Sequence, residues 1–332
     1  MQTLNSQDYI RAIKADLPRE AFLPAPKKLI RMFVYLFLVV MGYLAFRFTS
    51  SIFIYVLLSL FIGHTLACIA FLAHELAHGV IIKSRVLRYF LEFLFWGMLL
   101  IPATVWRRVH NHTHHAHAST PRDPDRPFFH SEESAATRWY TRVFYPNQRS
   151  LHWNPIVAFH LIPYIVRNIA AAFYPPLKTP ILVPAKPDYS TRQRLAVISE
   201  LFGITVFQVC IFILVGHNWL AYLFASPLAY LLTSAVTMAY IFTNHFLNPI
   251  HEANDPLLGT TSVIVPPVLD RLHENFSFHT EHHIFPNMNS DFYPLVATAL
   301  RKRFPERYNS VRLLEAWKRL WRREEFVSDK EK

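Results

Sequence analysis

The sequence predicts an all-α integral membrane protein with four transmembrane helices in two hairpins, interfacial helices and a cytosolic histidine-rich cap. Composition is the first reason: hydrophobic residues make up 52% of the 332 residues and charged residues only 17%, as is typical of membrane-spanning chains. The second reason is four long apolar runs in two closely spaced pairs. The third is an unusual content of 18 histidines, many of them in three short clusters.

The first pair of apolar runs covers Leu29–Phe46 and Ser51–Ala73. Crossing a hydrocarbon core takes about 20 helical residues, and the short connection between these two runs predicts a tight hairpin. Residues 1–28 are polar and are expected to form a cytosolic N-terminal segment. The first residues lack a basic stretch followed by an apolar core, so we expect no cleavable signal peptide.

Two further apolar stretches are less suited to crossing the membrane. Tyr89–Val105 is short and contains Glu92, which predicts a re-entrant or interfacial helix. Asn154–Tyr174 contains Arg167, and we expect it to lie at the membrane interface.

The second pair of long runs covers Leu195–Val215 and Leu220–Phe242, joined by a short turn at residues 216–218. The chain after Asn244 is polar enough to lie outside the membrane. We therefore assign residues 29–290 to one membrane domain and residues 291–332 to a cytosolic C-terminal segment. That segment is expected to contain an amphipathic basic helix over Val311–Arg323.

Charge predicts the orientation of this four-span arrangement. Only Arg47 lies at the turn opposite to the many basic residues that share one side. Because basic loops stay in the cytosol, both termini and the histidine clusters are expected on the cytosolic face. The basic residues on that side are Lys27, Lys28, Arg31, Lys83, Arg85, Arg88, Arg107, Arg108, Arg192, Arg194, Arg301, Lys302 and Arg303.

The formal net charge of +11 also limits the possible partners. A basic surface suits membrane lipids, an anionic acyl carrier or an acidic electron donor. The sequence contains no nucleic-acid-binding motif, so we expect no nucleic-acid partner. Cys68 and Cys210 both fall in apolar runs, which predicts buried thiols and no disulfide.

The first histidine cluster, His74-Glu75-Leu76-Ala77-His78, closes the second apolar run. Residues four apart lie on the same face of a helix, so both imidazoles are expected to point at one spot. The same five residues also match HExxH, the signature of zinc proteases. An intramembrane zinc protease is therefore an alternative interpretation of this cluster alone.

The second and third clusters each end in an adjacent pair of histidines. Neighbouring side chains on a helix point about 100° apart, so each pair suits one ligand to each of two metal ions. Together the clusters offer more imidazoles than a single four-coordinate zinc accepts, and imidazole binds zinc, copper, iron or nickel. The residues alone therefore predict two metal ions of unspecified identity. The candidate ligands are His74, His78, His110, His114, His115, His279, His282 and His283.

The three clusters resemble the histidine boxes of the membrane fatty acid desaturase family, HxxxH, HxxxHH and HxxHH, in order and in spacing. The segments Arg122–Asp125 and His282–Pro286 also resemble sequences of that family. The resemblance covers roughly Phe71 to Pro286. It implies a non-haem di-iron centre held by the eight histidines. A ninth ligand often follows the last span. We expect it to be His245, with His251 as the alternative and Asn248 acting through a water as a third possibility.

The resemblance further implies an O2-dependent oxidoreductase that introduces a double bond into a fatty acyl chain. The aromatic residues of Tyr89–Trp96 are candidates for the lining of an acyl tunnel. No cysteine cluster or dinucleotide fingerprint occurs, so the electrons are expected from a separate ferredoxin, rubredoxin or cytochrome. A hydroxylase, ketolase, acetylenase or oxidative decarboxylase would carry the same boxes, and a non-enzymatic membrane scaffold is a further alternative.

Several polar neighbours of the boxes are candidates for orienting the imidazoles. These are Glu75, Asn111, Asp123, Asp125 and Glu281. His112 and His117 are expected to be neighbours and not ligands. His64 lies in the middle of the second apolar run and is expected to be a hydrogen-bonded structural histidine.

Overall fold

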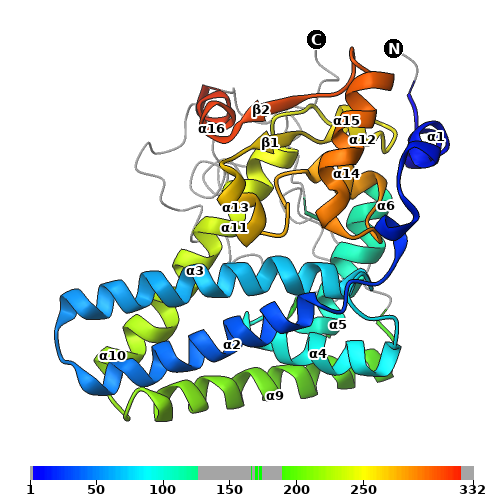
Figure 1. The fold of residues 1–332 in the computed structure, drawn as a ribbon. Helices are drawn as coiled ribbons and strands as arrows, with labels where there is room; N and C mark the ends of the chain where they lie inside the picture. The colour runs from blue at the N-terminus through cyan, green and yellow to red at the C-terminus, as the bar shows by residue number, and fades with distance from the viewer. Residues whose placement is uncertain (1–2, 126–165, 167–168, 171, 174–188, 323–332) are drawn as a thin grey trace, which may run out of the picture.

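The computed structural model is mostly helical and describes residues 3–125, 166, 169–170, 172–173 and 189–322. Four helices in this part of the chain are long and apolar enough to cross a membrane, which confirms the expected fold class. They are α2 (Lys28–Ala45), α3 (Ile52–Ala77), α9 (Thr191–Leu214) and a composite helix of α10 (Trp219–Leu223), the π-helical segment η6 (Phe224–Leu228) and α11 (Ala229–His245) (Figure 1).

Large apolar side chains cover the outer faces of these helices. Phe37 on α2 is 62% exposed, Phe53 on α3 is 71% exposed and Phe202 on α9 is 71% exposed. Such a surface is unfavourable in water and is stable against lipid chains. Cys210 also lies exposed on α9, so the expectation that both thiols are buried holds only for Cys68.

Helix α3 is the central element and packs against α2, α4 and α11. Its contact with α11 is close because Gly63 has no side chain: a Cβ there would lie 2.7 Å from the carbonyl oxygen of Ala229. The hydroxyl of Thr233 donates to the Gly63 carbonyl at 3.0 Å. Helix α3 continues through the first histidine cluster to Ala77, as the spacing of His74 and His78 predicted, and Leu76 and Ala77 are buried in the same core.

The stretch expected to be one re-entrant or interfacial helix is two helical segments joined by a sharp bend. Helix α4 (Arg85–Met98) is followed, after a change of direction of 102°, by a continuous helical run from Ala103 to His117. This run consists of α5 (Ala103–Trp106), the π-helix η4 (Arg107–His114) and α6 (His115–His117). Leu100 at the bend has φ 64, a left-handed conformation that turns the chain. The second expected interfacial helix, over residues 154–174, lies largely outside the described residues.

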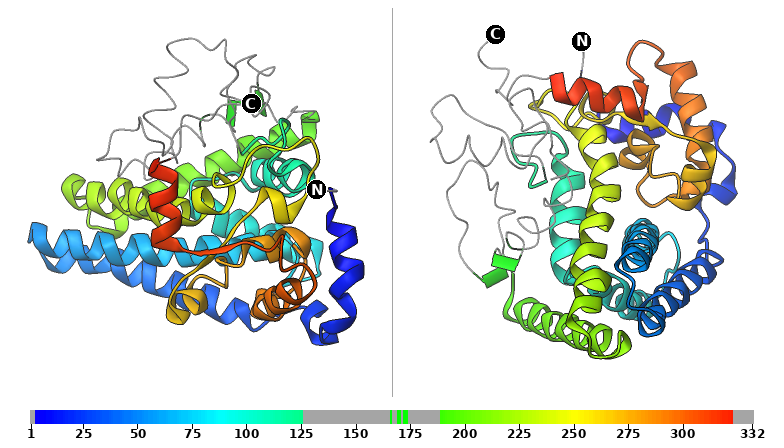
Figure 2. Two further views of the ribbon diagram at one scale, coloured as in Figure 1. Left: turned by 90° about the horizontal axis from the view of Figure 1, so that it is seen from above. Right: turned by 90° about the vertical axis from the view of Figure 1, so that its left-hand side faces the viewer.

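The chain after α11 forms a cap of short elements on one side of the long helices, and the N-terminal helix packs against it (Figure 2). Tyr9 anchors that N-terminal helix, since its hydroxyl donates to Asp255 at 2.9 Å. The elements of the cap are α12 (Pro256–Gly259), β1 (Ser262–Ile264), α13 (Pro267–Leu272), α14 (His279–Ile284), η7 (Ser290–Phe292), α15 (Tyr293–Arg303), β2 (Ser310–Arg312) and α16 (Leu313–Arg322), and the N-terminal elements are α1 (Ser6–Ile13), η1 (Lys14–Asp16) and η2 (Arg19–Phe22).

Two of these cap elements correct the sequence prediction. Strands β1 and β2 pair in parallel, with Val263 opposite Val311. The expected C-terminal helix therefore begins at Leu313 and not at Val311, because Val311 is buried in the strand pair.

Candidate metal centre

Four segments that are distant in sequence bring their histidines to one place beneath the cap. The end of α3 carries His74 and His78, and the end of α11 carries His245. The helical run through η4 and α6 contributes the second cluster, and α14 contributes the third. The expected convergence of the three clusters is therefore present in the structure.

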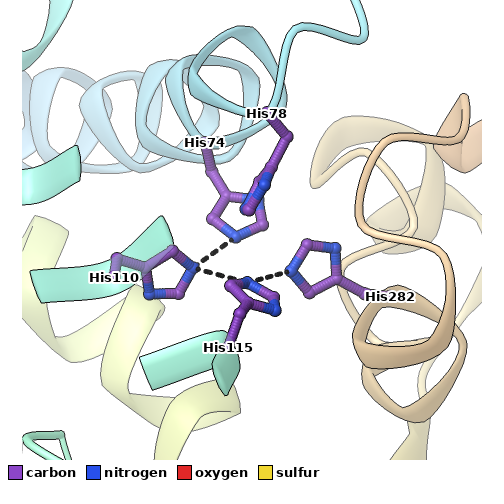
Figure 3. A group of neighbouring side chains, drawn as sticks. All are labelled: His74, His78, His110, His115 and His282. Carbon is purple, nitrogen blue, oxygen red and sulfur yellow. Dashed lines mark hydrogen bonds between the residues drawn. The ribbon is translucent and has the colours of Figure 1, made fainter. Parts of the chain in front are cut away.

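The imidazoles form two groups. The first consists of five histidines whose ring nitrogens converge (Figure 3): His74, His78, His110, His115 and His282. In the second group, His279 Nε2 lies 2.7 Å from His245 Nε2 and 3.2 Å from His283 Nε2. The ring of His114 lies against His245 and His283 at centroid distances of 4.8 and 5.1 Å.

Within the first group, a chain of short contacts joins the ring nitrogens. His110 Nε2 lies 2.9 Å from His74 Nε2 and 3.3 Å from His115 Nε2. His115 Nε2 is in turn 3.1 Å from His282 Nε2. Ligands of one metal ion approach each other to similar distances, so this group has the dimensions of a metal site.

Each adjacent histidine pair is divided between the two groups. His115 and His282 belong to the first group, whereas His114 and His283 belong to the second. The sequence analysis expected this division from the angle between neighbouring helical side chains. It did not foresee that His110 shares a group with His115, five residues later. The π-helical segment η4 explains this pairing because its i→i+5 hydrogen bonds place residue i+5 over residue i.

Buried acceptors hold two of the rings. His114 Nδ1 lies 2.8 Å from Asp123 Oδ1. The second carboxylate oxygen of Asp123, Oδ2, accepts a hydrogen bond from the backbone N–H of Ser119. His282 Nδ1 lies 3.2 Å from the hydroxyl of Tyr293. Tyr293 was missed by the sequence analysis, since it lies outside every histidine box and carries no motif.

The other polar candidates have different contacts. Asp125 lies 3.7 Å from His110 Nδ1, and Asn111 donates to the carbonyl of Ala77, which joins η4 to α3. Glu75 accepts from Lys28 Nζ at 2.6 Å. Glu281 accepts from Ser262 and Tyr308 and so anchors the strand pair instead of orienting an imidazole.

Among the described residues, the other candidate histidines lie apart from the two groups. His251 is bound through its backbone to Ser119 and is not in either group, so of the two alternatives for a ninth imidazole His245 is the one at the centre. His112 lines a separate cavity with Arg107 and Arg108. His64 contacts Cys68 and His273.

The histidines of α14 are held in their neutral form. Burial lowers the pKa of His279 to about 3, with the charge of His114 as a second cause. Burial, followed by neighbouring imidazoles, also holds the pKa values of His282 and His283 well below 6.5. Neutral imidazole is the form that binds metal ions.

An apolar cavity of about 100 Å³ adjoins both groups. Its lining includes His74, His110 and His279 and otherwise consists mainly of aromatic and aliphatic side chains. Of the aromatic run expected to line a tunnel, Trp96 reaches the cavity. The further lining residues include Phe71, Trp106, Tyr230, Met238 and Phe242.

Comparison with known proteins assigns the chain to a family. The family model for fatty acid desaturases matches residues 50–314. The chain belongs to the fatty acid desaturase family. It is accordingly an oxidoreductase, and the zinc-protease alternative drawn from His74–His78 is not supported.

Two curated relatives are desaturases, in agreement with the family match. The chain is 24% identical over 260 residues to an omega-6 fatty acid desaturase of the endoplasmic reticulum (isozyme 1) from Glycine max, covering 76% of this chain and 66% of that protein. It is 23% identical over 292 residues to an sn-1 acyl-lipid omega-3 desaturase (ferredoxin) from Synechocystis, covering 84% of this chain and 76% of that protein. At this identity the comparison supports a desaturase-type enzyme and does not identify the product.

Proposed function

We propose that this enzyme introduces a double bond into a fatty acyl chain. The reaction removes one hydrogen from each of two neighbouring carbons, and O2, two electrons and two protons are converted with these hydrogens into two molecules of water. The observation that carries the proposal is the apolar cavity whose lining includes histidines of both groups. An apolar cavity of this kind suits a segment of an alkyl chain and excludes water.

The donor atoms fit the pair of iron ions that is usual in this family. His78 Nε2 is buried and has no hydrogen-bond partner among the described residues, so it is available to a metal ion. In our proposal His74, His78, His110, His115 and His282 hold one ion, and His114, His245, His279 and His283 hold the other. When bound, the iron pair supplies the oxidation of an unactivated C–H bond, which no side chain can perform.

The protein's own contribution is to position the substrate. Phe71, Trp96 and Trp106 line the cavity beside the histidines and are expected to hold the acyl chain with one C–C bond against the centre. Asp123 and Tyr293 keep the rings of His114 and His282 in their orientation.

The electrons are proposed to come from a separate acidic carrier, as a ferredoxin is named for the cyanobacterial relative. Arg301, Lys302 and Arg303 form an exposed basic end of α15 on the cap. Such a charge attracts an acidic partner and accelerates its docking. We further propose that the four long helices all cross the membrane, surrounded by lipid, and that the cap lies in the cytosol.

Lipid analysis of a host that lacks the activity tests the proposal. Expression of the wild-type chain should yield fatty acids with two hydrogens fewer and no added oxygen. A product with an added oxygen would indicate a hydroxylase instead. An unchanged lipid profile, despite correctly folded protein and an added electron donor, would contradict any acyl-chain oxidation.

Two matched variants test the metal assignment. His245→Ala should lose most of the bound iron and the product, because His245 lies between His114, His279 and His283. His251→Ala should keep both, because His251 lies outside the groups. Equal iron content in the two variants would remove His245 from the proposed ligands.

A further inference from the structure

A second cluster of metal-binding side chains lies on α3, away from the nine histidines described above. His64 and Cys68 are four residues apart and therefore share a face of this helix. His273, which follows α13, reaches the same face, and His273 Nε2 lies 3.2 Å from His64 Nε2. Cys68 Sγ lies 3.9 Å from His64 Nδ1. One ligand atom from each of the three residues lies within 4.8 Å of the others.

The separation of these atoms suits a single ion. A tetrahedral zinc-type ion has bonds of about 2.0–2.1 Å to nitrogen and 2.3 Å to sulfur, which places its ligand atoms roughly 3.3–3.7 Å apart. One donor atom from each residue lies within 4.8 Å of the others, so in our proposal rotation of the side chains about their χ angles shortens the longer separations when the ion binds. Cys68 and His273 are buried and His64 is half-buried, so the cluster is enclosed by protein on most sides.

The contacts of His273 repeat those of His282 in the metal centre. His273 Nδ1 lies 2.9 Å from the hydroxyl of Tyr240, and His282 Nδ1 lies 3.2 Å from the hydroxyl of Tyr293. In both cases Nε2 points at Nε2 of another histidine. A partner on Nδ1 that fixes the ring and leaves Nε2 for the metal is the usual arrangement of metal-binding histidines. Burial lowers the pKa of His273 to about 4, which keeps it neutral as metal binding requires.

We propose that His64, Cys68 and His273 bind a third metal ion, a single divalent thiophilic ion of the zinc type. The thiolate selects a soft or borderline metal, and the half-buried position of His64 leaves room for a fourth ligand. This site is distinct from the proposed iron centre: His64 precedes His74 by ten residues, a distance of about 15 Å along a helix.

The position of the site gives the ion a structural role. It would join α3, which carries the first histidine cluster, to the segment that leads into the third cluster on α14. Phe71 lies between the two parts, with its ring 4.9 Å from the ring of His273 and 4.8 Å from that of Phe276. Phe276 in turn contacts the rings of His74 and His279 at 5.2 and 5.1 Å. The ion is therefore expected to stabilise the alignment of the two clusters.

Cobalt spectroscopy of the purified full-length protein tests the site independently of the reaction. A thiolate bound to Co²⁺ gives a near-ultraviolet charge-transfer band, whereas the proposed iron ligands are all imidazoles and give none. The chain has two cysteines, and Cys210 is an exposed matched control. Addition of Co²⁺ should produce the band in the wild type and in Cys210→Ser, and Cys68→Ser should abolish it. A wild-type protein without the band, or a band that persists in Cys68→Ser, would overturn the proposal.

Metal analysis of a second variant covers the case in which Cys68→Ser fails to fold. His64→Gln, at the half-buried position, should lose about one equivalent of zinc per chain and weaken cobalt binding at least tenfold. Unchanged zinc content and cobalt affinity would show that the three residues form only a hydrogen-bonded cluster. Loss of iron or of lipid product in His245→Ala leaves this test unaffected, so the two proposals can fail separately.

Discussion

The carboxylate of Asp123 contacts the ring of His114, one of the proposed metal ligands. It is fully buried, and its Oδ1 lies 2.8 Å from His114 Nδ1. Asp123→Asn keeps the shape but removes the charge that orients and polarises the ring. We expect metal affinity to fall about 10–100-fold, as for other partners of metal-binding histidines. Iron per chain, measured after dialysis against a weak chelator, checks this expectation.

The matched control is Asp16→Asn. The Asp16 side chain is 43% exposed, and its carboxylate pairs with Arg303 at 3.5 Å, away from the histidines. This variant should retain wild-type iron and activity. Retention of iron by Asp123→Asn under the same dialysis would mean that Asp123 only stabilises the local turn through Ser119.

Lys28 forms buried ion pairs with two carboxylates, one of which, Glu75, belongs to the first histidine cluster. Its Nζ lies 2.6 Å from Glu75 and 3.0 Å from Glu274, and all three side chains are no more than 7% exposed. Lys28→Met leaves the two carboxylates without this counterion. Removal of one partner of a buried ion pair costs about 3–5 kcal/mol, so the midpoint of thermal unfolding in detergent should fall clearly.

The double variant Lys28→Met/Glu75→Gln should recover part of that loss, because one of the buried negative charges is removed as well. If the two single changes were simply additive, the proposed coupling between Lys28 and Glu75 would be wrong. The same contact explains why Glu75 need not act as the base that an HExxH motif suggests: its carboxylate is engaged by a lysine 47 positions earlier.

The sequence predicts the histidines of the centre better than their supporting residues. Spacing within each box indicated which imidazoles share a helix face, and the family resemblance implied a ninth ligand after the last span, for which His245 was preferred. Tyr293 and Lys28 carry no such local signal, because their partners lie 11 and 47 positions away and become neighbours only in the folded chain. Glu281 was predicted from adjacency to His282, but on α14 its side chain points toward Ser262.

At the scale of elements, the crossing of α3 and α11 sets the distance between His74 and His245. Gly63 permits this crossing, since a Cβ there would lie 2.7 Å from both the Ala229 oxygen and Leu232 Cβ. Gly63→Val should push the helices apart, lower the unfolding temperature and reduce iron binding. Gly97→Ala is the control, because its Cβ would meet the ring of Phe207 at 3.1 Å and Ile204 Cγ1 at 4.0 Å, which are side chains and not backbone. Wild-type iron content in Gly63→Val would show that the helix crossing tolerates a side chain.

Hydropathy predicts the long helices because lipid requires long uninterrupted apolar runs. It does not predict the 102° bend after α4 or the π-helix η4. Both depend on local backbone geometry: a left-handed Leu100 and an i→i+5 pattern that no residue type specifies. The sequence therefore located the second cluster without revealing which of its histidines meet.

At the scale of the molecule, the cap was the least predictable part. Its elements are short, and the pairing of β1 with β2 joins residues 48 positions apart, Ser262 with Ser310. No periodicity in three-residue strands can indicate such a contact. The cap is nevertheless the part that encloses the third cluster, since α14 packs against α1, α12 and α15.

The arrangement of the whole molecule predicts a topology that can be measured. Helices α1, α14 and α16 lie on the side of the cap, whereas the turn between α2 and α3 and the turn between α9 and α10 lie together at the far end of the long helices (Figure 1). Arg47 ties these two turns, since it donates to the Ile213 carbonyl at 3.1 Å. With basic residues concentrated on the cap side, that side should remain in the cytosol.

Glycosylation mapping in a eukaryotic host tests this topology. An acceptor sequence inserted at residues 49–51 or 216–218, on a spacer long enough to clear the membrane, should be modified in the lumen. The same acceptor fused to either terminus should stay unmodified, because α1 and α16, the first and last described helices, belong to the cap side. Modification at a terminus, or protection of both turns in a folded and iron-loaded protein, would place the histidine centre on the opposite face. The electron carrier would then have to be lumenal, and the basic end of α15 would lose its proposed cytosolic partner.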